Sequence, residues 1–167
     1  LGQLAHSDRP EIGERAPADA LVTGVGLVDG RKVAVLAVDS TVLAGTTGWV
    51  GTRKQAQLVA LAMRKGYALV CLGDANGGRI PDLLGSGFAG VIGDHEGEDF
   101  LGYRIEVDRV PRVTAIMGNA YGDPALWSAV SDFVVMSQGS TLGLSGPSLV
   151  AASVGEALTH EQLAGPD

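Results

Sequence analysis

Two stretches of the sequence share one pattern: YALVCLGDANGGR at residues 67–79 and RVTAIMGNAYGDP at residues 112–124. Each opens with a short, continuous apolar run, at 67–72 and at 112–117, which is typical of a strand buried on both faces. Each run then enters a glycine-rich segment. Because strands buried on both faces occur where helices cover a sheet, the two stretches predict an α/β domain.

A helix is predicted just before the first of these runs, from residue 52 to residue 65. Ala56, Val59, Ala60 and Met63 recur at helical spacing, and Gly66 ends the pattern. A crossover helix joins strands that run in the same direction. The order of strand, helix and strand therefore predicts an α/β unit with strands in near-parallel register.

Further out, the hydrophobic pattern predicts shorter elements. Asp29-Gly30 forms the turn of a hairpin, and Asp123-Pro124 is interpreted as the N-cap and first residue of a helix. The expected ranges are strands at 20–27 and 32–38, a helix from 123 to about 131, strands at 133–136 and 141–144, and a helix at 147–154. Residues 1–17 are expected to form an extended lead-in, and residues 18–167 a single domain.

Composition excludes several classes of protein. The chain has 167 residues, of which 46% are hydrophobic, and a formal net charge of −7, which disfavours non-specific binding to nucleic acid or to an anionic membrane. No apolar run is long enough to cross a membrane. The single cysteine, Cys71, excludes an internal disulfide and a cysteine-based zinc cluster, is expected to pack in the core, and favours a cytoplasmic location.

The glycine-rich segments at residues 73–78 and 118–122 are the first place to look for chemistry. In open α/β sheets, ligands bind outside the carboxyl ends of the strands. Glycine lets backbone N–H groups approach a ligand, and two such groups that converge on one carbonyl oxygen form an oxyanion hole. The alternative interpretation is that both segments are only tight turns between strand and helix.

Several segments of the chain carry a resemblance to a known family. They include ADALVTGVGLVDGRKVAVLAVDSTVLAGTTG at 18–48, RKQAQLVALAMRKG at 53–66, DANGGRIPD at 74–82, IMGNAYG at 116–122 and SDFVVM at 131–136. In their order and spacing, these segments resemble the N-terminal half of the carboxyltransferase (beta) subunit of biotin-dependent acyl-CoA carboxylases. The propionyl-CoA and methylcrotonyl-CoA carboxylases are examples of that family, which belongs to the crotonase superfamily.

The resemblance implies a crotonase-like (ClpP/crotonase) fold, a spiral of β-β-α units, of which this chain is the first of two such domains. It implies that a carboxyl group passes from carboxybiotin, held on a separate carrier domain, to the α-carbon of a coenzyme A thioester through an enolate. The implied partners are a second carboxyltransferase domain or subunit and the biotin carboxylase and biotin carrier components, in an oligomer. No side-chain nucleophile is needed for this chemistry, because preorganised donors absorb the enolate charge.

Carried over residue by residue, the resemblance assigns the catalytic role to the backbone around Gly77, Gly78, Gly122 and Asp123. The family has Asp-Ser-Gly-Gly-Ala-Arg-Ile where this chain has DANGGRI at 74–80, so Gly78 stands in place of alanine and still offers an N–H. The family has Gly-Gly-Ala where this chain has Gly122-Asp123-Pro124. Pro124 has no N–H, and the Asp123 carboxylate would oppose a developing negative charge.

Two basic residues are candidates for binding coenzyme A. Lys54 matches a lysine of the family and could meet a phosphate, or it could lie on a solvated helix face together with Arg53, Arg64 and Lys65. Arg79 directly follows Gly78 and could touch the ligand or pair with Asp74.

The remaining candidates are weaker. His6, His95 and His160 lack the spacing of metal ligands, and the acidic residues around His95 are interpreted as a solvated loop, so no metal site is predicted. Trp127 could line an acyl pocket or fill the core.

Three functions remain open. The chain is an acyl-CoA carboxyltransferase half, a biotin-independent crotonase-type enzyme such as a decarboxylase, or a non-catalytic assembly subunit. The Asp123-Pro124 pair motivates the third hypothesis.

Overall fold

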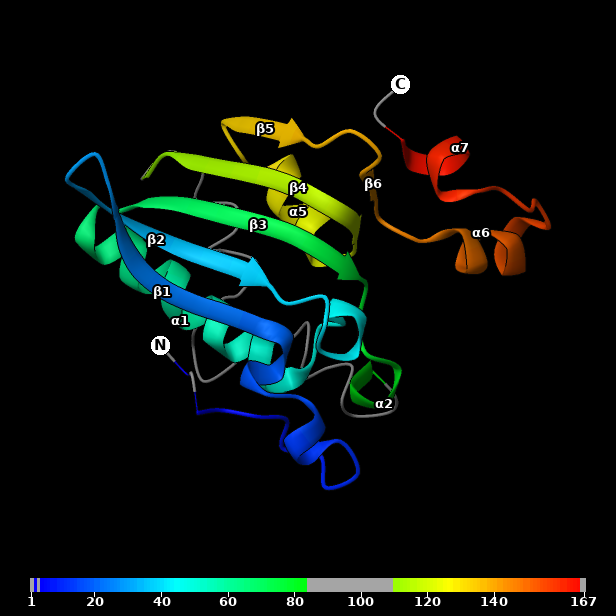
Figure 1. Ribbon diagram of the computed structural model, residues 1–167, viewed down its shortest axis with the longest axis horizontal. Helices are drawn as coiled ribbons and strands as arrows, with labels where there is room; N and C mark the ends of the chain where they lie inside the picture. The colour runs from blue at the N-terminus through cyan, green and yellow to red at the C-terminus, as the bar shows by residue number, and fades with distance from the viewer. Residues whose placement is uncertain (1, 3, 84–109, 166–167) are drawn as a thin grey trace.

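The computed structural model describes residues 2, 4–83 and 110–165. Their central feature is a twisted sheet in the order β1-β2-β3-β4-β5, with β6 paired to the end of β4 (Figure 1). Only the hairpin β1–β2 is antiparallel, and the other pairs are parallel. The strands are β1 Leu21–Val28, β2 Arg31–Val38, β3 Ala68–Asn76, β4 Arg112–Tyr121, β5 Phe133–Met136 and β6 Thr141–Gly143. The mixed α/β class and the near-parallel register predicted from the sequence are confirmed.

One face of the sheet is covered by helix α1, Trp49–Lys65, and by the short helix α5, Asp123–Ala129, both of which lie behind the sheet in Figure 1. Helix α1 begins at Trp49, before the predicted start at Thr52, and ends at Gly66 in the left-handed conformation that glycine adopts readily (φ 65°). The core under these helices includes Leu36, Leu58, Leu69, Cys71 and Trp127. The packing role predicted for Cys71 is confirmed.

The other face of the sheet is apolar along all five strands of the main path. It carries Val22, Val35, Ala37, Val70, Leu72, Val113, Ala115, Met117, Phe133 and Val135, which alternate with the covered positions. Val22 is 53% exposed, Met117 60% and Phe133 61%. None of the described helices covers this surface, which we call the open sheet face (Figure 1).

The strands β3 and β4 run further than the sequence predicts. β3 continues through Asn76 and β4 through Tyr121, so most of the residues expected in two glycine-rich loops belong to the sheet. A bulge between Gly73 and Ala75 lets the pairing resume at Ala75 with Ala120. The loops proper are therefore reduced to the residues that follow Asn76 and Tyr121.

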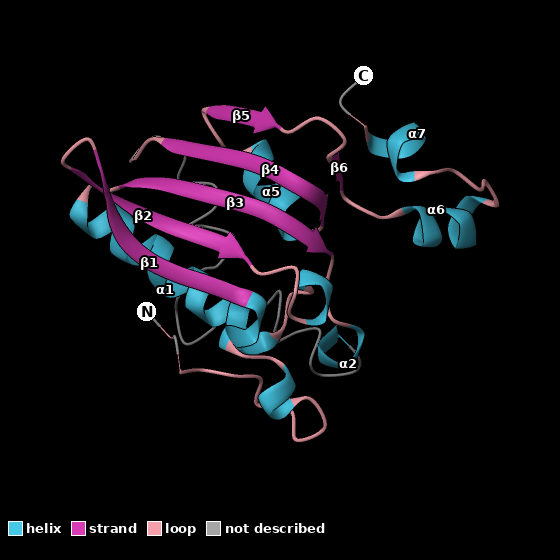
Figure 2. Cartoon of the chain, in the orientation of Figure 1, coloured by secondary structure: helices cyan, strands magenta, loops and turns pink. Residues whose placement is uncertain are grey.

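The N-terminal segment is packed rather than extended. A 3-10 helix covers Gly13–Arg15, and Ile12 and Ala16 form a second small cluster with Ala20 and Val42. Two more 3-10 helices lie at Ala18–Ala20 and Leu43–Gly45, and short helices α2 at Ile80–Leu83, α6 at Pro147–Val154 and α7 at His160–Ala164 (Figure 2). Helix α7, which the hydrophobic pattern does not predict, begins with a capping box formed by Thr159 and Gln162. No helix in the described ranges is long and apolar enough to span a membrane.

Candidate active site

The two predicted glycine segments meet at the carboxyl ends of β3 and β4. Asn76 pairs with Tyr121 at the end of the ladder, so the turns that follow leave the sheet side by side. A Cβ added to Gly122 would lie 3.2 Å from the Gly77 Cα and 3.9 Å from the Gly78 amide nitrogen. The closeness expected of these glycines is therefore found.

The turn at Gly77-Gly78 is held by the loop that precedes α1. The Thr47 N–H donates to the Gly77 carbonyl at 2.9 Å, and the Arg79 N–H donates to the Thr47 carbonyl at 2.8 Å. Neither of these bonds uses the Gly78 N–H. Gly77 has φ of +84°, which glycine adopts without strain.

The Gly122 N–H is engaged within the chain. It donates to the Leu144 carbonyl at 3.2 Å, just after β6. Gly122 has φ of 75° and ψ of −119° and is the N-cap of α5, whose first turn is closed by the Ala125 and Leu126 N–H groups on the Gly122 carbonyl. In this conformation of the chain, the Gly122 N–H does not serve as a second oxyanion donor.

The start of α5 differs by one residue from the prediction. Gly122 is the N-cap, Asp123 is the first helical residue, and Pro124 follows within the first turn, where its missing N–H leaves no helical hydrogen bond unmade. Pro124 is fully buried, and a Cβ on Gly73 would lie 2.8 Å from the Pro124 Cβ. Pro124 therefore packs α5 directly against the backbone of β3.

One of the two predictions for Arg79, a pair with Asp74, is wrong. Its Nη1 donates to the Asp19 carboxylate at 2.6 Å and lies 3.5 Å from Asp82, and its Nη2 donates to the Thr46 carbonyl at 3.0 Å. The Arg79 side chain is only 5% exposed. Its guanidinium therefore holds neighbouring segments together instead of facing solvent.

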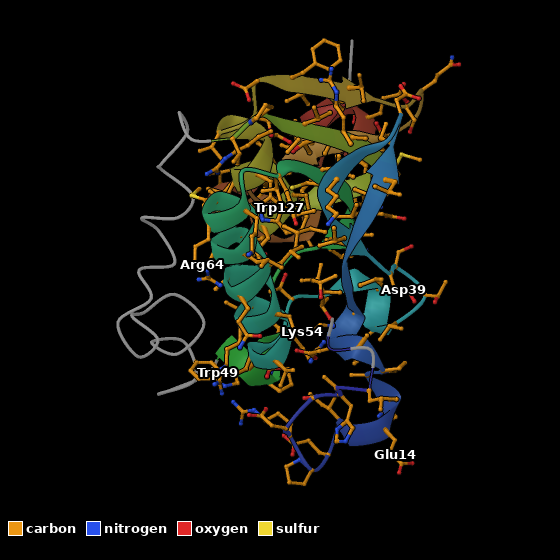
Figure 3. All side chains as sticks on the ribbon, turned by 90° about the vertical axis from the view of Figure 1, so that its left-hand side faces the viewer. Glu14, Asp39, Trp49, Lys54, Arg64 and Trp127 are labelled. Atoms are coloured by element: carbon orange, nitrogen blue, oxygen red, sulfur yellow. The ribbon has the colours of Figure 1, made fainter. Side chains whose placement is uncertain are left out.

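Lys54 is not part of a solvated helix face, and its amine is occupied by backbone carbonyls. The Nζ donates to the carbonyls of Ala18 and Leu21, and Figure 3 shows the side chain on the side of α1 that faces the N-terminal segment, opposite Arg64. Burial lowers the pKa of the Lys54 amine below its ordinary value of 10.5, and the Asp19 carboxylate partly offsets this shift. Arg53, Arg64 and Lys65 are exposed, as predicted.

Trp127 and His160, two of the remaining candidates, make contacts within the fold. Trp127 is 5% exposed and lies in the core, so the packing interpretation is the one that the structure supports. His160 accepts or donates a hydrogen bond at 2.7 Å with the Tyr121 hydroxyl, and His95 with its acidic neighbours lies outside the described residues. Within the described ranges, no group of three His, Cys, Asp or Glu residues could hold a metal ion.

A wide groove lies at the opposite end of the sheet and contains none of the predicted site residues. It is lined by Arg31, Lys32, Lys65 and Tyr67, among others, near the amino ends of the parallel strands. The chemistry expected of this fold belongs at the carboxyl ends of the strands. The glycine turns therefore remain the candidate site.

The Carboxyl transferase domain family matches residues 1–167, the whole chain. The chain belongs to this family. It is 33% identical over 157 residues to the biotin-dependent acetyl-/propionyl-coenzyme A carboxylase beta5 subunit of Mycobacterium tuberculosis. The matched region covers 92% of this chain and 27% of that protein. It is also 33% identical over 152 residues to the methylmalonyl-CoA decarboxylase subunit alpha of Propionigenium modestum, covering 89% of this chain and 28% of that protein.

Solved structures agree on the fold. The transcarboxylase 12S structure with methylmalonyl-coenzyme A bound has a TM-score of 0.76 at 25% identity, covering 99% of this chain and 32% of that one. The beta subunit of geranyl-CoA carboxylase from P. aeruginosa has a TM-score of 0.76 at 23% identity, covering 99% of this chain and 29% of that one. The crotonase-like fold predicted from the resemblance is confirmed. The carboxyl transferase chain spans about a quarter of the length of the curated relatives it matches.

The sequence pattern gave no sign of the role of Asp19. This aspartate is 1% exposed and binds both Arg79 and the Gly51 N–H in the first turn of α1, the latter at 2.6 Å. An aspartate next to small residues after Pro17 is typical of a surface turn, so no local signal marks it as buried. Only the pairing of a buried aspartate with a buried arginine sixty positions later would have revealed it.

Proposed function

We propose that this chain is the acyl-CoA-binding half of a carboxyltransferase that moves a carboxyl group from carboxybiotin to the α-carbon of an acyl-CoA. The observation that carries the proposal is the contact between the Gly77-Gly78 turn and Gly122 at the carboxyl ends of β3 and β4. Membership of the carboxyl transferase family supports the reaction class. The relatives named as biotin-dependent carboxylases support carboxybiotin as the donor.

In this proposal, the chain binds the thioester and stabilises negative charge on its oxygen. Removal of the α-proton by a base would give an enolate, whose α-carbon would form the new bond to the carboxyl carbon as the N–C bond of carboxybiotin breaks. The biotin nitrogen released in this way would take up a proton. The donor assigned to this chain is the Gly78 N–H, which takes no part in the two hydrogen bonds between Thr47 and the turn. Carboxybiotin supplies the carboxyl group, and the resemblance assigns its binding to a second domain, so none of the described residues is given a role toward it.

The Gly78 backbone offers a sharp test, because proline removes an N–H while alanine keeps it. In the complete enzyme, with acyl-CoA and labelled bicarbonate, we expect Gly78→Ala to stay near the wild-type rate, since the resemblance places alanine at this position. Loss of one oxyanion donor lowers kcat by about a hundredfold or more, which is the result expected of Gly78→Pro. Equal rates in the two variants would refute the assignment.

Decarboxylation is a second candidate, because one of the relatives at 33% identity is named as a methylmalonyl-CoA decarboxylase subunit. Loss of carbon dioxide from a carboxylated acyl-CoA leaves the same enolate, which the same donor would stabilise before a proton is added. Avidin separates the candidates. Release of carbon dioxide from a carboxylated acyl-CoA that persists in the presence of avidin would favour a biotin-independent decarboxylase, whereas complete inhibition would favour carboxyl transfer.

The proposal includes a partner: a second carboxyltransferase domain or subunit, whose apolar surface packs on the open sheet face of this chain. Exposed apolar patches of this kind mark interaction sites in soluble proteins. Helix α6 supports the same proposal, since it has no buried residue while Leu149 is 59% and Val154 65% exposed. Phe133→Asp on the open sheet face is expected to weaken the assembly by size-exclusion chromatography with light scattering, whereas the matched change Leu4→Asp, at a residue 95% exposed in the N-terminal segment, is not.

A further inference from the structure

A buried ion-pair cluster lies directly behind the Gly77-Gly78 turn. Arg79 follows Gly78 in the chain, and its guanidinium contacts the carboxylates of Asp19 and Asp82 and the Thr46 carbonyl. Asp19 and Asp82 are each 1% exposed. Charged groups this deeply buried are costly unless they are paired, so the cluster joins three segments of chain rigidly at this point.

Asp19 reaches the cluster through an unusual backbone. Ala18, Asp19 and Ala20 have φ of 52°, 51° and 60°, a conformation that residues with a side chain rarely adopt. The Lys54 amine donates hydrogen bonds to the Ala18 carbonyl within this stretch and to the Leu21 carbonyl just after it. Strain of this kind persists only where the surroundings over-determine it, and it is concentrated at functional sites.

Glycines make the room that this arrangement needs. A Cβ on Gly48 would lie 2.3 Å from the Arg79 Nη1 and 2.7 Å from an Asp19 carboxylate oxygen. A Cβ on Gly51 would lie 3.0 Å from the Asp19 carbonyl oxygen. Both glycines lie at the start of α1, whose Gly51 N–H is bound by Asp19. The start of α1 is therefore fitted around the Asp19–Arg79 pair.

Arg79, the partner of Asp19, also fixes the backbone of the candidate site. The Arg79 N–H closes the bridge to Thr47, and its side chain binds Thr46 one residue earlier, so Arg79 fixes its own turn at two points on one loop. Gly77, in the same turn, lies against Gly122. A shift of Arg79 would thus move the Gly78 amide relative to Gly122.

We infer that Asp19 is a positioning residue, which acts through Arg79 to hold the Gly78 N–H in the geometry that stabilises the thioester oxyanion. The inference deepens the proposed function and rests on it. Asp19 does not touch the substrate in this scheme. Its effect is on the rate of the chemical step rather than on substrate affinity, because a misplacement of about 1 Å can lower a rate by about a hundredfold.

The first test is Asp19→Asn, which removes the charge and keeps the shape. In the complete enzyme we expect kcat to fall by about tenfold to a hundredfold, with KM for the acyl-CoA nearly unchanged. The matched control is Asp29→Asn, the same change at an exposed aspartate that also has a positive φ (49°), in the β1–β2 turn. Unchanged kcat in Asp19→Asn, or equal effects of the two variants, would overturn the inference.

A double-mutant cycle tests whether Asp19 acts through Arg79. If it does, Asp19→Asn has little further effect on kcat in the Arg79→Gln background, where the charge that Asp19 binds is absent, whereas independent roles give multiplicative losses and would overturn the inference. Should Asp19→Asn fail to fold, Arg79→Lys and Arg79→Gln carry the test, with the lysine variant expected to keep the greater part of the rate. A uniform loss of kcat and of thermal stability, with no difference between lysine and glutamine, would indicate a merely structural role.

Hydrogen exchange separates this inference from the proposed function, since it needs no turnover. The Arg79 amide, bound to Thr47, is expected to exchange faster in Asp19→Asn, while amides of β3 and β4 keep their wild-type rates. If the wild-type enzyme carries out no acyl-CoA chemistry, the proposed function fails whatever the exchange shows. If it is active and the Arg79 amide is unaffected by the substitution, only the positioning role fails.

Discussion

Gly122→Ala tests the contact on which the candidate site depends. Gly122 has φ of 75° and ψ of −119°, and holding a residue with a side chain in such a sparsely populated region costs about 1–3 kcal/mol. The new Cβ would also lie 3.2 Å from the Gly77 Cα, which is backbone and cannot rotate away. Overpacking of this kind costs a further amount of about 1–3 kcal/mol.

Gly139→Ala is the matched control, because Gly139 has φ of 77° and a Cβ there would meet nothing within 4 Å. Only the backbone term applies to it, about 1–2 kcal/mol. We expect urea unfolding to show Gly122→Ala to be less stable than Gly139→Ala by about 1 kcal/mol or more, and the kcat of the complete enzyme to fall by about a hundredfold in Gly122→Ala alone. Equal stability and unchanged kcat would show that the two glycine turns are not in contact.

Three further predictions follow from other buried groups. Lys54→Met leaves the Ala18 and Leu21 carbonyls without their donor and is expected to lower the free energy of unfolding at neutral pH by about 1–3 kcal/mol. Because the pKa of Lys54 is lowered in the folded state, the unfolded chain binds more protons between that lowered value and 10.5, so wild-type stability should rise with pH through this window relative to Lys54→Met in urea titrations at several pH values. Tyr121→Phe removes the hydroxyl that meets His160 at 2.7 Å and Thr141 at 3.2 Å, and it should cost about 1–2 kcal/mol and speed hydrogen exchange in α7; unaltered exchange there would contradict the docking role of this hydroxyl. The Cys71 thiol is 2% exposed and should react with Ellman's reagent only when the chain unfolds, whereas rapid reaction in native buffer would show that the core is open at β3.

The type and order of the main elements could be predicted because their signals are local. Asp29 and Gly30 both have positive φ in the β1–β2 turn, as the hairpin prediction requires. Gly66 ends α1 in the left-handed conformation, and the apolar run predicted at 67–72 lies, from Ala68 onward, in a strand with parallel neighbours on both sides. A turn, a cap and a hydrophobic run each leave a mark within a few residues.

The ends of β3 and β4 could not be predicted because their stability comes from pairing with each other. DANGG and GNAYG have the composition of turns, and nothing within either stretch indicates a strand. The ladder nevertheless resumes at Ala75 with Ala120 after the bulge, and β6 then pairs with β4 from Asn119 onward. The hydrogen bonds that extend these strands depend on partners far away in the sequence.

The position of the candidate site in the fold could be predicted from the sequence, but most of the side-chain contacts around it could not. The rule that ligands bind at the carboxyl ends of parallel strands brought Gly77, Gly78 and Gly122 together correctly. The predicted pairing of Arg79 with Asp74 and the solvated-face interpretation of Lys54 were wrong, because each side chain is long enough to reach segments from other parts of the chain. Arg79 donates a hydrogen bond to Asp19, and Lys54 donates to the carbonyls of Ala18 and Leu21.

The departure of Asp123-Pro124 from the family pattern has a structural account. Pro124 occupies a helical position where no N–H is needed, and it packs on the backbone of Gly73 in β3. Asp123 opens α5, where a carboxylate is favoured by the partial positive charge of a helix start. Since the Gly122 N–H is bound to Leu144 and Pro124 offers none, stabilisation of an oxyanion rests mainly on the side of the site formed by Gly78. That asymmetry is why the Gly78 N–H, held in place by the Asp19–Arg79 pair, is the donor on which we expect stabilisation of the oxyanion to depend.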